Sequence, residues 1–225
     1  MRILIANDDG IYSPGIAALA RIATRFGDVR VVAPDVERSS AGHSITSSRP
    51  VRYRRTHVFD DIEAYRVDGT PADCVALGAN QWDDVDLVLS GINMGPNLGN
   101  ATWHSGTLAA AKQAVLLGIR GIALSAPVGD ETTDFSELEP WVERALSTIL
   151  ERDEPSLVNV NFPLRPRGMR WTRQAVDRYD GRVVPDTHAV ADGLVSLTPL
   201  RLDLTDHAAL AAAPAEAGPA TAPAR

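Results

Sequence analysis

The first 34 residues alternate a strand, a helix and a second strand, and this alternation constrains the fold more than any other feature. Residues 2–6 form a short, nearly continuous apolar run, which is typical of a strand buried on both faces. Ser13 can act as an N-cap and Pro14 as the first helical residue, and apolar residues then recur at helical spacing up to Gly27. Residues 29–33 form a second apolar run. A β-α-β unit of this kind has parallel strands and a right-handed connection, so the sequence predicts an α/β fold.

The alternation continues along most of the chain. Further strands are expected at residues 51–54, 64–67, 85–89, 121–125 and 157–161, and helices at 71–80, 105–117 and 135–150, with a Gly- and Asn-rich loop at 90–104. We therefore expect residues 1–162 to form an α/β core with a mostly parallel sheet. Residues 163–207 are expected to form a C-terminal extension with strands at 170–176 and 194–197, and residues 208–225, rich in Ala and Pro, a disordered tail.

Composition restricts the partners of the chain. Its 22 basic and 29 acidic residues give a net charge of −7, so a nucleic-acid duplex or an anionic membrane is a poor partner. A phosphate group must then be held locally, by backbone N–H groups or a metal. The single cysteine, Cys74, excludes an intrachain disulfide and a cysteine-based zinc site. Neither a signal peptide nor an apolar run of membrane-spanning length is present, so we expect a cytoplasmic protein.

The first polar cluster, Asn7-Asp8-Asp9-Gly10, directly follows the first strand. Ligands of open α/β sheets bind at the carboxyl ends of strands. Two adjacent carboxylates at such a position repel each other, and a hard cation would relieve that repulsion. An Asx turn with Asp as a local cap is the alternative interpretation.

Three further clusters also follow strands or begin a helix. The loop at residues 90–100 carries three glycines and three asparagines, but it is neither a dinucleotide fingerprint nor a Walker loop. Residues 104–107 open a helix whose free N–H groups suit a phosphate, with Ser105 as a plain N-cap the alternative. Residues 37–44 follow the second strand and supply a serine and a histidine.

Taken together, these clusters place oxygen ligands beside an anion-binding helix N-terminus. Oxygen ligands favour Mg²⁺ or Mn²⁺ over Zn²⁺. A hard cation beside a phosphate-binding site is typical of enzymes that hydrolyse phosphoesters. The nucleophile elbow G-x-S-x-G of many serine hydrolases is absent from the sequence.

Long motifs occur in a fixed order over residues 1–207. They are Asn7-Asp8-Asp9-Gly10, Ser13-Pro14-Gly15, Ala33-Pro34-Asp35, Gly42-His43-Ser44-Ile45-Thr46, Gly69-Thr70-Pro71-Ala72-Asp73, Ser90-Gly91-Ile92-Asn93, Gly95-Pro96-Asn97-Leu98-Gly99, Ser105-Gly106-Thr107 and Thr198-Pro199-Leu200. In these motifs the chain resembles the SurE family of stationary-phase survival proteins, which are metal-dependent 5′/3′-nucleotidases.

The resemblance implies a Rossmann-like three-layer αβα sandwich with one divalent metal ion, Mg²⁺ or Mn²⁺, in each subunit. It implies that the metal ligands are Asp8, Asp9, Ser39 and Asn93. It implies that the phosphate is held by Asn97, Ser105, Gly106 and Thr107. It also implies a homodimer that exchanges its C-terminal extension and often pairs into tetramers, and Asp203 and His207 match positions of the exchanged segment.

The chain departs from the family between residues 178 and 193. Relatives carry a longer segment there, with a Gly-Thr-Asp motif of which Thr187 is a candidate relic. We expect the shortened segment, residues 180–192, to form a hairpin or loop near the subunit interface and the active-site mouth. His104 stands where tyrosine is common in the family.

The hypothesis is therefore hydrolysis of nucleoside 5′-monophosphates, and of 3′-monophosphates as a further activity, to nucleoside and phosphate. Asp8 or Asp9 would orient or deprotonate the water. His43 or His104 could protonate the leaving alkoxide, although a loop histidine is more often structural. Two alternatives stay open: an aspartyl-phosphate intermediate on Asp8, and a nucleotide-binding module without catalysis. A dinucleotide-dependent oxidoreductase is disfavoured because the glycine fingerprint is missing.

Overall fold

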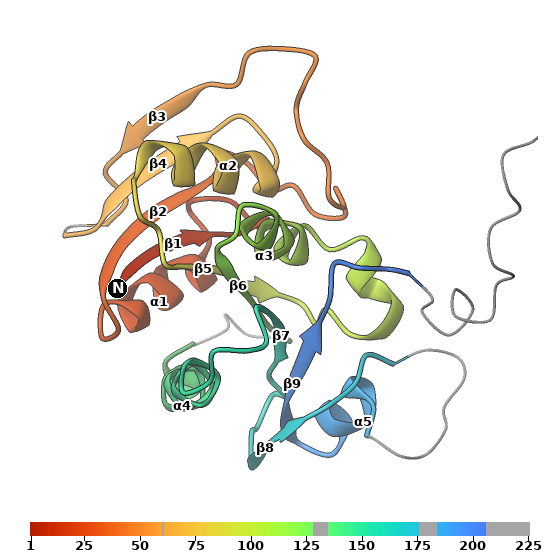
Figure 1. Cartoon of the computed structure of the whole chain (residues 1–225). Coiled ribbons are helices and arrows are strands. Elements are labelled where there is room, and N and C mark those ends of the chain that lie inside the picture. Colours follow the sequence, from red (N-terminus) through yellow and green to blue (C-terminus); the bar gives the residue numbers. More distant parts are fainter. Residues whose placement is uncertain (60, 128–134, 176–183, 206–225) are drawn as a thin grey trace, which may run out of the picture.

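The computed structural model describes residues 1–59, 61–127, 135–175 and 184–205. Within these ranges a nine-stranded sheet has the strand order β3-β4-β2-β1-β5-β6-β7-β9-β8 (Figure 1). The strands are β1 (Arg2–Ala6), β2 (Asp28–Pro34), β3 (Tyr53–Thr56), β4 (Glu63–Val67), β5 (Leu87–Met94), β6 (Arg120–Ala126), β7 (Leu157–Asn161), β8 (Gly168–Trp171) and β9 (Leu194–Leu200). The α-helices are α1 (Pro14–Ala23), α2 (Pro71–Gln81), α3 (Gly106–Leu116), α4 (Glu139–Leu150) and α5 (Asp186–Ala191).

Helices cover both faces of the sheet, which gives the three-layer sandwich that the family resemblance implied. Strand β1 shows why: Ile3 and Ile5 belong to the core shared with α1 and α4, whereas Leu4 and Ala6 belong to the core shared with α2. Because alternate side chains of a strand point to opposite faces, a strand between two helical layers is apolar at every position. The prediction of a mostly parallel α/β fold is confirmed.

The sheet reverses its strand order at β1. This strand pairs in parallel with β2 on one side and with β5 on the other. The chain therefore builds the sheet outward in both directions from β1, and a crevice forms where the connections diverge. The carboxyl ends of β1 and β5 border that crevice, which is where the polar clusters of the sequence lie.

Strand β5 is longer than the sequence predicted. It was expected to end at residue 89, with a loop from residue 90, but it runs to Met94. After an irregularity in register, Asn93 pairs with Ser125 and Met94 with Ala126 of β6. Gly91 allows the close approach, since a Cβ there would lie 2.2 Å from the carbonyl oxygen of Leu124. Asn93 is thus fixed by a strand and not by a loop.

Smaller differences have local causes. The single helix expected at residues 135–150 divides into a 3₁₀ turn (Phe135–Leu138) and α4, because Pro140 lacks an N–H group and favours a helix start. A second 3₁₀ turn, η1 (Gly99–Trp103), interrupts the loop expected at residues 90–104. Strand β3 begins and ends two residues later than expected, at Tyr53 and Thr56.

The C-terminal extension continues the sheet. Strand β9 pairs antiparallel with β7, and β8 pairs in parallel with β9. Strand β8 covers Gly168–Trp171 and not residues 170–176, and the described part of the shortened segment forms helix α5 where a hairpin or loop was expected. His207 and the tail at residues 208–225 lie outside the described residues. None of the helices in the described ranges combines the length and apolar character that crossing a membrane requires.

Candidate active site

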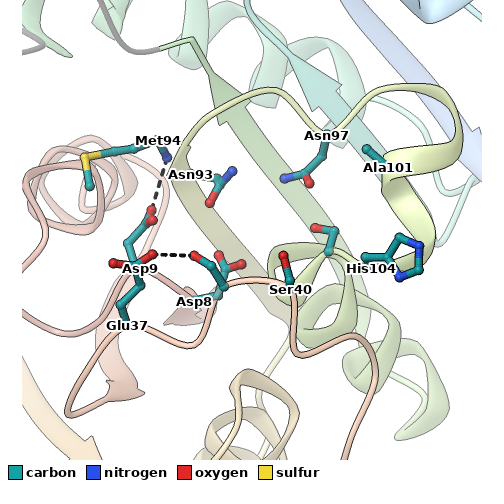
Figure 2. Close-up of a pocket in the computed structure, with 11 residues that line it drawn as sticks. Asp8, Asp9, Glu37, Ser40, Asn93, Met94, Asn97, Ala101 and His104 are labelled. Carbon is teal, nitrogen blue, oxygen red and sulfur yellow. Dashed lines mark hydrogen bonds between the residues drawn. The ribbon is translucent and has the colours of Figure 1, made fainter.

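A pocket of about 550 Å³ lies at the carboxyl ends of β1 and β5 (Figure 2). It brings together residues from the turn after β1, from the segment after β2, from the end of β5, from the segment between β5 and α3, and from the N-cap of α3. The lining residues are Asp8, Asp9, Glu37, Ser39, Ser40, Asn93, Met94, Asn97, Ala101, His104 and Ser105. The clusters expected from the sequence therefore converge on one cavity, at the strand-order reversal.

The turn that carries the two carboxylates is shaped by Asn7, which is fully buried. The Asn7 side chain donates hydrogen bonds to the Gly10 carbonyl oxygen (2.9 Å) and the Ser13 hydroxyl (2.8 Å), and accepts one from the Gly10 N–H. Ser13 in turn caps helix α1. One asparagine thus ties the end of β1 to the start of α1, with Asp8 and Asp9 held between them.

Asp8 is the most enclosed charged group of the pocket, with 4% of its surface exposed. Helix α3 abuts it: a Cβ on Gly106 would lie 2.8 Å from both the Cβ and Oδ2 of Asp8. The Thr107 hydroxyl donates a hydrogen bond of 2.7 Å to Asp8 Oδ1. Burial raises the pKa of Asp8 above its ordinary value of 3.8, and the bond from Thr107 opposes that rise.

Asp9 is less enclosed and accepts a hydrogen bond of 3.1 Å from the Met94 N–H (Figure 2). Burial, with the nearby charges of Asp8 and Glu37, raises the pKa of Asp9 to about 6. Two carboxylates that both resist ionisation lie side by side in the chain. A cation between them would offset the cost of keeping both charged.

The donor set fits a hard divalent cation. Asn93 donates its side-chain N–H to the Gly95 carbonyl oxygen (2.7 Å), which leaves its amide oxygen as the free acceptor. The Ser39 hydroxyl donates to Glu37 Oε1 (2.7 Å), so its lone pairs stay available. With Asp8 and Asp9, these residues offer oxygen atoms alone, which suits Mg²⁺ or Mn²⁺. Within the described ranges, no group of three or more His, Cys, Asp or Glu side chains could hold a metal ion.

The start of helix α3 offers an anion site beside Asp8. The Ser105 side chain accepts a hydrogen bond from the Leu108 N–H (3.0 Å) and caps the helix. The first N–H groups of a helix, here those of Gly106 and Thr107, have no partner inside the helix. They carry the positive end of the helix dipole, which favours a phosphate group.

Two asparagines of strand β7 fix the position of Asn97. Its N–H donates to Asn161 Oδ1 (2.8 Å), and its carbonyl oxygen accepts bonds from the side chains of Asn159 (2.8 Å) and Asn161 (3.1 Å). The Asn97 amide donates to Ser125 Oγ (2.8 Å). Asn97 therefore stands rigidly at the pocket wall.

The two accessory histidines occupy different places. His104 lines the pocket on the side where Ala101 lies (Figure 2). His43 lines a neighbouring cavity with Trp103 and Lys112, and its Nε2 is 2.9 Å from Gln113 Oε1. The structure does not bring His43 to the pocket that holds Asp8 and Asp9.

Sequence reasoning missed several contributors. Glu37 was present in the segment after β2, but only the contact with Ser39 shows its place. Asn161 is the last residue of β7 and Asn159 lies two residues before it, so a search for polar residues near strand ends would have pointed to them. Ser125 is likewise the residue before the last one of β6.

Comparison with known proteins gives consistent matches. A family model described as "Survival protein SurE" matches residues 3–181. The chain is 45% identical to "5′-nucleotidase SurE 1" of Thermus thermophilus, over 94% of this chain and 96% of the relative. It is 43% identical to "5′-nucleotidase SurE" of Deinococcus radiodurans, over 91% of this chain and 88% of the relative. The crystal structure of the SurE protein from Aquifex aeolicus superposes with a TM-score of 0.80 at 36% identity, covering 94% of this chain and 98% of that one.

Proposed function

This chain belongs to the SurE family, and on that premise we propose that it is a phosphomonoesterase that hydrolyses nucleoside 5′-monophosphates to nucleoside and inorganic phosphate. The relatives named 5′-nucleotidase support this reaction class. The single observation that carries the proposal to this chain is the contact between Asp8 and the start of helix α3. It brings a buried carboxylate against the start of a helix whose N-cap, Ser105, lines the same pocket.

The proposed binding mode follows from that contact. The phosphate group lies at the N–H groups of Gly106 and Thr107, with Asn97 and Ser105 at the sides. Fixed donors of this kind stabilise the charge that builds up on the phosphoryl oxygens in the transition state without reorganising.

The proposed metal ligands are Asp8, Asp9, Ser39 and Asn93, for one Mg²⁺ or Mn²⁺ ion in each subunit. When bound, the ion supplies Lewis-acid polarisation of a phosphoryl oxygen. Asp9 has one carboxylate oxygen held by the Met94 N–H, which leaves its other oxygen for the ion. Asp8 or Asp9 orients or deprotonates the attacking water. Asp8, held by Thr107, keeps its carboxylate in a fixed orientation.

The leaving alkoxide needs a proton, and His104 is the proposed donor because it lines the same pocket as Asp8. His43 is assigned a structural role in this proposal, through its contact with Gln113. We also propose a cytoplasmic homodimer that exchanges the extension at residues 163–207. Pairing of these dimers into tetramers is part of the same proposal.

A phosphate-release assay tests the function. The four common ribonucleoside 5′- and 3′-monophosphates would be incubated with Mg²⁺ or Mn²⁺, and Asp9→Asn would serve as the inactive control. We expect phosphate release from the 5′-monophosphates that depends on the metal and is lost in Asp9→Asn. Tight binding of a monophosphate without phosphate release would instead establish a binding module.

The route through the phosphoryl group is tested separately. Direct attack by water inverts the configuration at phosphorus and places one solvent oxygen in the phosphate in a single step. An aspartyl-phosphate on Asp8 would retain the configuration and could be trapped. We expect inversion, since the Asp-x-Asp spacing typical of phosphatases that form an aspartyl-phosphate is absent here, where Asp8 is followed directly by Asp9.

A further inference from the structure

The loop that carries Asn97 is fastened at Gly99 by the C-terminal extension, and we propose that Asp186 and Gln174 are positioning residues for phosphate binding. This inference rests on the proposed function, because it assigns Asn97 to the phosphate. Gly99 lies two residues beyond Asn97 and begins the turn η1, which leads to Ser105. A displacement of Gly99 therefore moves both ends of the phosphate site.

Asp186 is fully buried and its carboxylate accepts three N–H groups. Oδ2 accepts from Gly99 (3.0 Å), and Oδ1 accepts from Ala175 (2.9 Å) and Thr187 (2.8 Å). Each of these groups is a donor, so the side chain at this position must act as an acceptor on both oxygens. Three hydrogen bonds from N–H groups offset the cost of burying this side chain.

Gln174 holds the other side of the same peptide. Its Nε2 donates to the Gly99 carbonyl oxygen (2.9 Å) and to Thr102 Oγ1 (2.8 Å). Thr102 also donates to the Gly99 carbonyl oxygen (2.9 Å). Both the N–H and the carbonyl of Gly99 are therefore satisfied by side chains, and two of these side chains belong to the C-terminal extension.

The backbone at Gly99 depends on this attachment. Gly99 has φ +52, in the left-handed region, and a Cβ there would lie 3.4 Å from the Cβ of Ala175. The loop thus turns sharply at the point where the extension touches it. The C-terminal extension therefore contacts the loop of the proposed phosphate site through Gln174 and Asp186.

The test uses Asp186→Asn, which keeps the shape of the side chain but places an NH₂ group against at least one N–H donor. Asp192→Asn is the matched control, because Asp192 is exposed at the other end of α5. We expect KM for adenosine 5′-monophosphate and the inhibition constant of inorganic phosphate to rise about tenfold in Asp186→Asn, the usual effect of losing a bond to a charged group. The Kd of Mn²⁺ should not change, since its proposed ligands lie on other elements.

Gln174→Met removes the hydrogen bond to the Gly99 carbonyl oxygen with little change in side-chain volume. This variant tests the positioning role if Asp186→Asn does not fold. A merely structural role would lower the amount of active enzyme, and hence kcat, without moving KM or the phosphate inhibition constant. Unchanged KM and phosphate inhibition in the folded variants would overturn the inference, as would a parallel loss of Mn²⁺ binding. If the wild type released no phosphate, the proposed function would fail, whereas calorimetry of phosphate binding would still test the positioning role.

Discussion

The hydroxyl group of Thr107 donates a hydrogen bond of 2.7 Å to the carboxylate of Asp8, so the first turn of α3 and the end of β1 meet at one oxygen atom. The two residues lie 99 positions apart in the sequence. We therefore propose that the Thr107 side chain orients the carboxylate, while its backbone N–H group, which also lowers the pKa of Asp8, is its donor toward the phosphate.

Replacing Thr107 with valine tests that division of roles. Thr107→Val keeps the volume but removes the donor, and Asp8 loses a hydrogen bond to a charged group, about 1.5–3 kcal/mol. We expect kcat/KM for a nucleoside 5′-monophosphate to fall about ten- to hundredfold. Thr107→Ser restores the hydroxyl and should recover most of the activity; equal losses in both variants would show that the hydroxyl is not what matters.

A methyl group at Gly106 should damage the site more than the fold. The added Cβ would lie 2.8 Å from Asp8, so Gly106→Ala forces the carboxylate and the helix apart and costs about 1–3 kcal/mol of overpacking. We expect a large loss of kcat/KM in steady-state kinetics.

Gly118→Ala is the matched control for Gly106→Ala, because Gly118 lies beyond the other end of α3. Gly118 has φ +79 and an added Cβ meets nothing within 4 Å, so alanine costs about 1–2 kcal/mol of backbone strain alone. Gly118→Ala should lower Tm and leave kcat/KM intact. A loss of activity equal to that of Gly106→Ala would argue against a specific contact at Asp8.

Several features of this site could be predicted from the sequence because they are local. The turn of Asn7, Asp8 and Asp9 and the Ser13 cap lie within a few residues of each other. Asn and Asp commonly form turns, and Ser commonly caps a helix, by hydrogen bonds to nearby groups. The β-α-β alternation likewise indicated where strands end, which is where ligands bind in this class of sheet.

What could not be predicted depends on contacts between distant segments. The extension of β5 to Met94 follows from pairing with β6. The hydrogen bond that fixes the Asn97 N–H comes from Asn161, which is 64 positions away. Asp186 reaches Gly99 across 87 positions, and nothing in its local sequence marks it as an acceptor for that peptide. Residues 139–150 form the expected helix, and only the first four residues of the expected range differ, as a 3₁₀ turn ahead of Pro140.

Divalent metal should stabilise the folded protein. A cation bound at Asp8 and Asp9 in the native state alone raises the free energy of unfolding, by about 2.7 kcal/mol when the free metal is 100 times Kd. We expect Tm, followed by calorimetry, to rise with Mg²⁺ or Mn²⁺ and to return when the metal is chelated. Asp9→Asn should lose most of the rise, whereas Asp192→Asn should keep it; an equal rise in all three proteins would place the metal elsewhere.

The stability of the fold should depend on pH through Asp73. Burial alone would raise the pKa of Asp73, but hydrogen bonds from Thr46 and Thr70 outweigh it, and the pKa lies below its ordinary value of 3.8. A carboxylate with a lowered pKa stabilises the fold above its unfolded pKa, and that contribution is lost as pH falls through the folded pKa.

Asp73→Ala should therefore lower the free energy of unfolding by about 1–2 kcal/mol at pH 7, since it removes the capping box of α2. The deficit relative to the wild type should shrink below pH 4, where protonation weakens the same bonds in the wild type. Urea titrations at both pH values measure it, with the exposed Asp83→Ala as control. A deficit that is constant with pH would mean that the charge of Asp73 contributes nothing.

The most direct test of the account is the turnover of Asp8→Asn, which keeps the size of the side chain and removes its charge. The rate of phosphate release from a nucleoside 5′-monophosphate would be measured with Mg²⁺ or Mn²⁺, beside circular dichroism and Tm. The account predicts that phosphate release is abolished while the fold is retained. Wild-type turnover in a folded Asp8→Asn protein would contradict the assignment of this pocket as the active site.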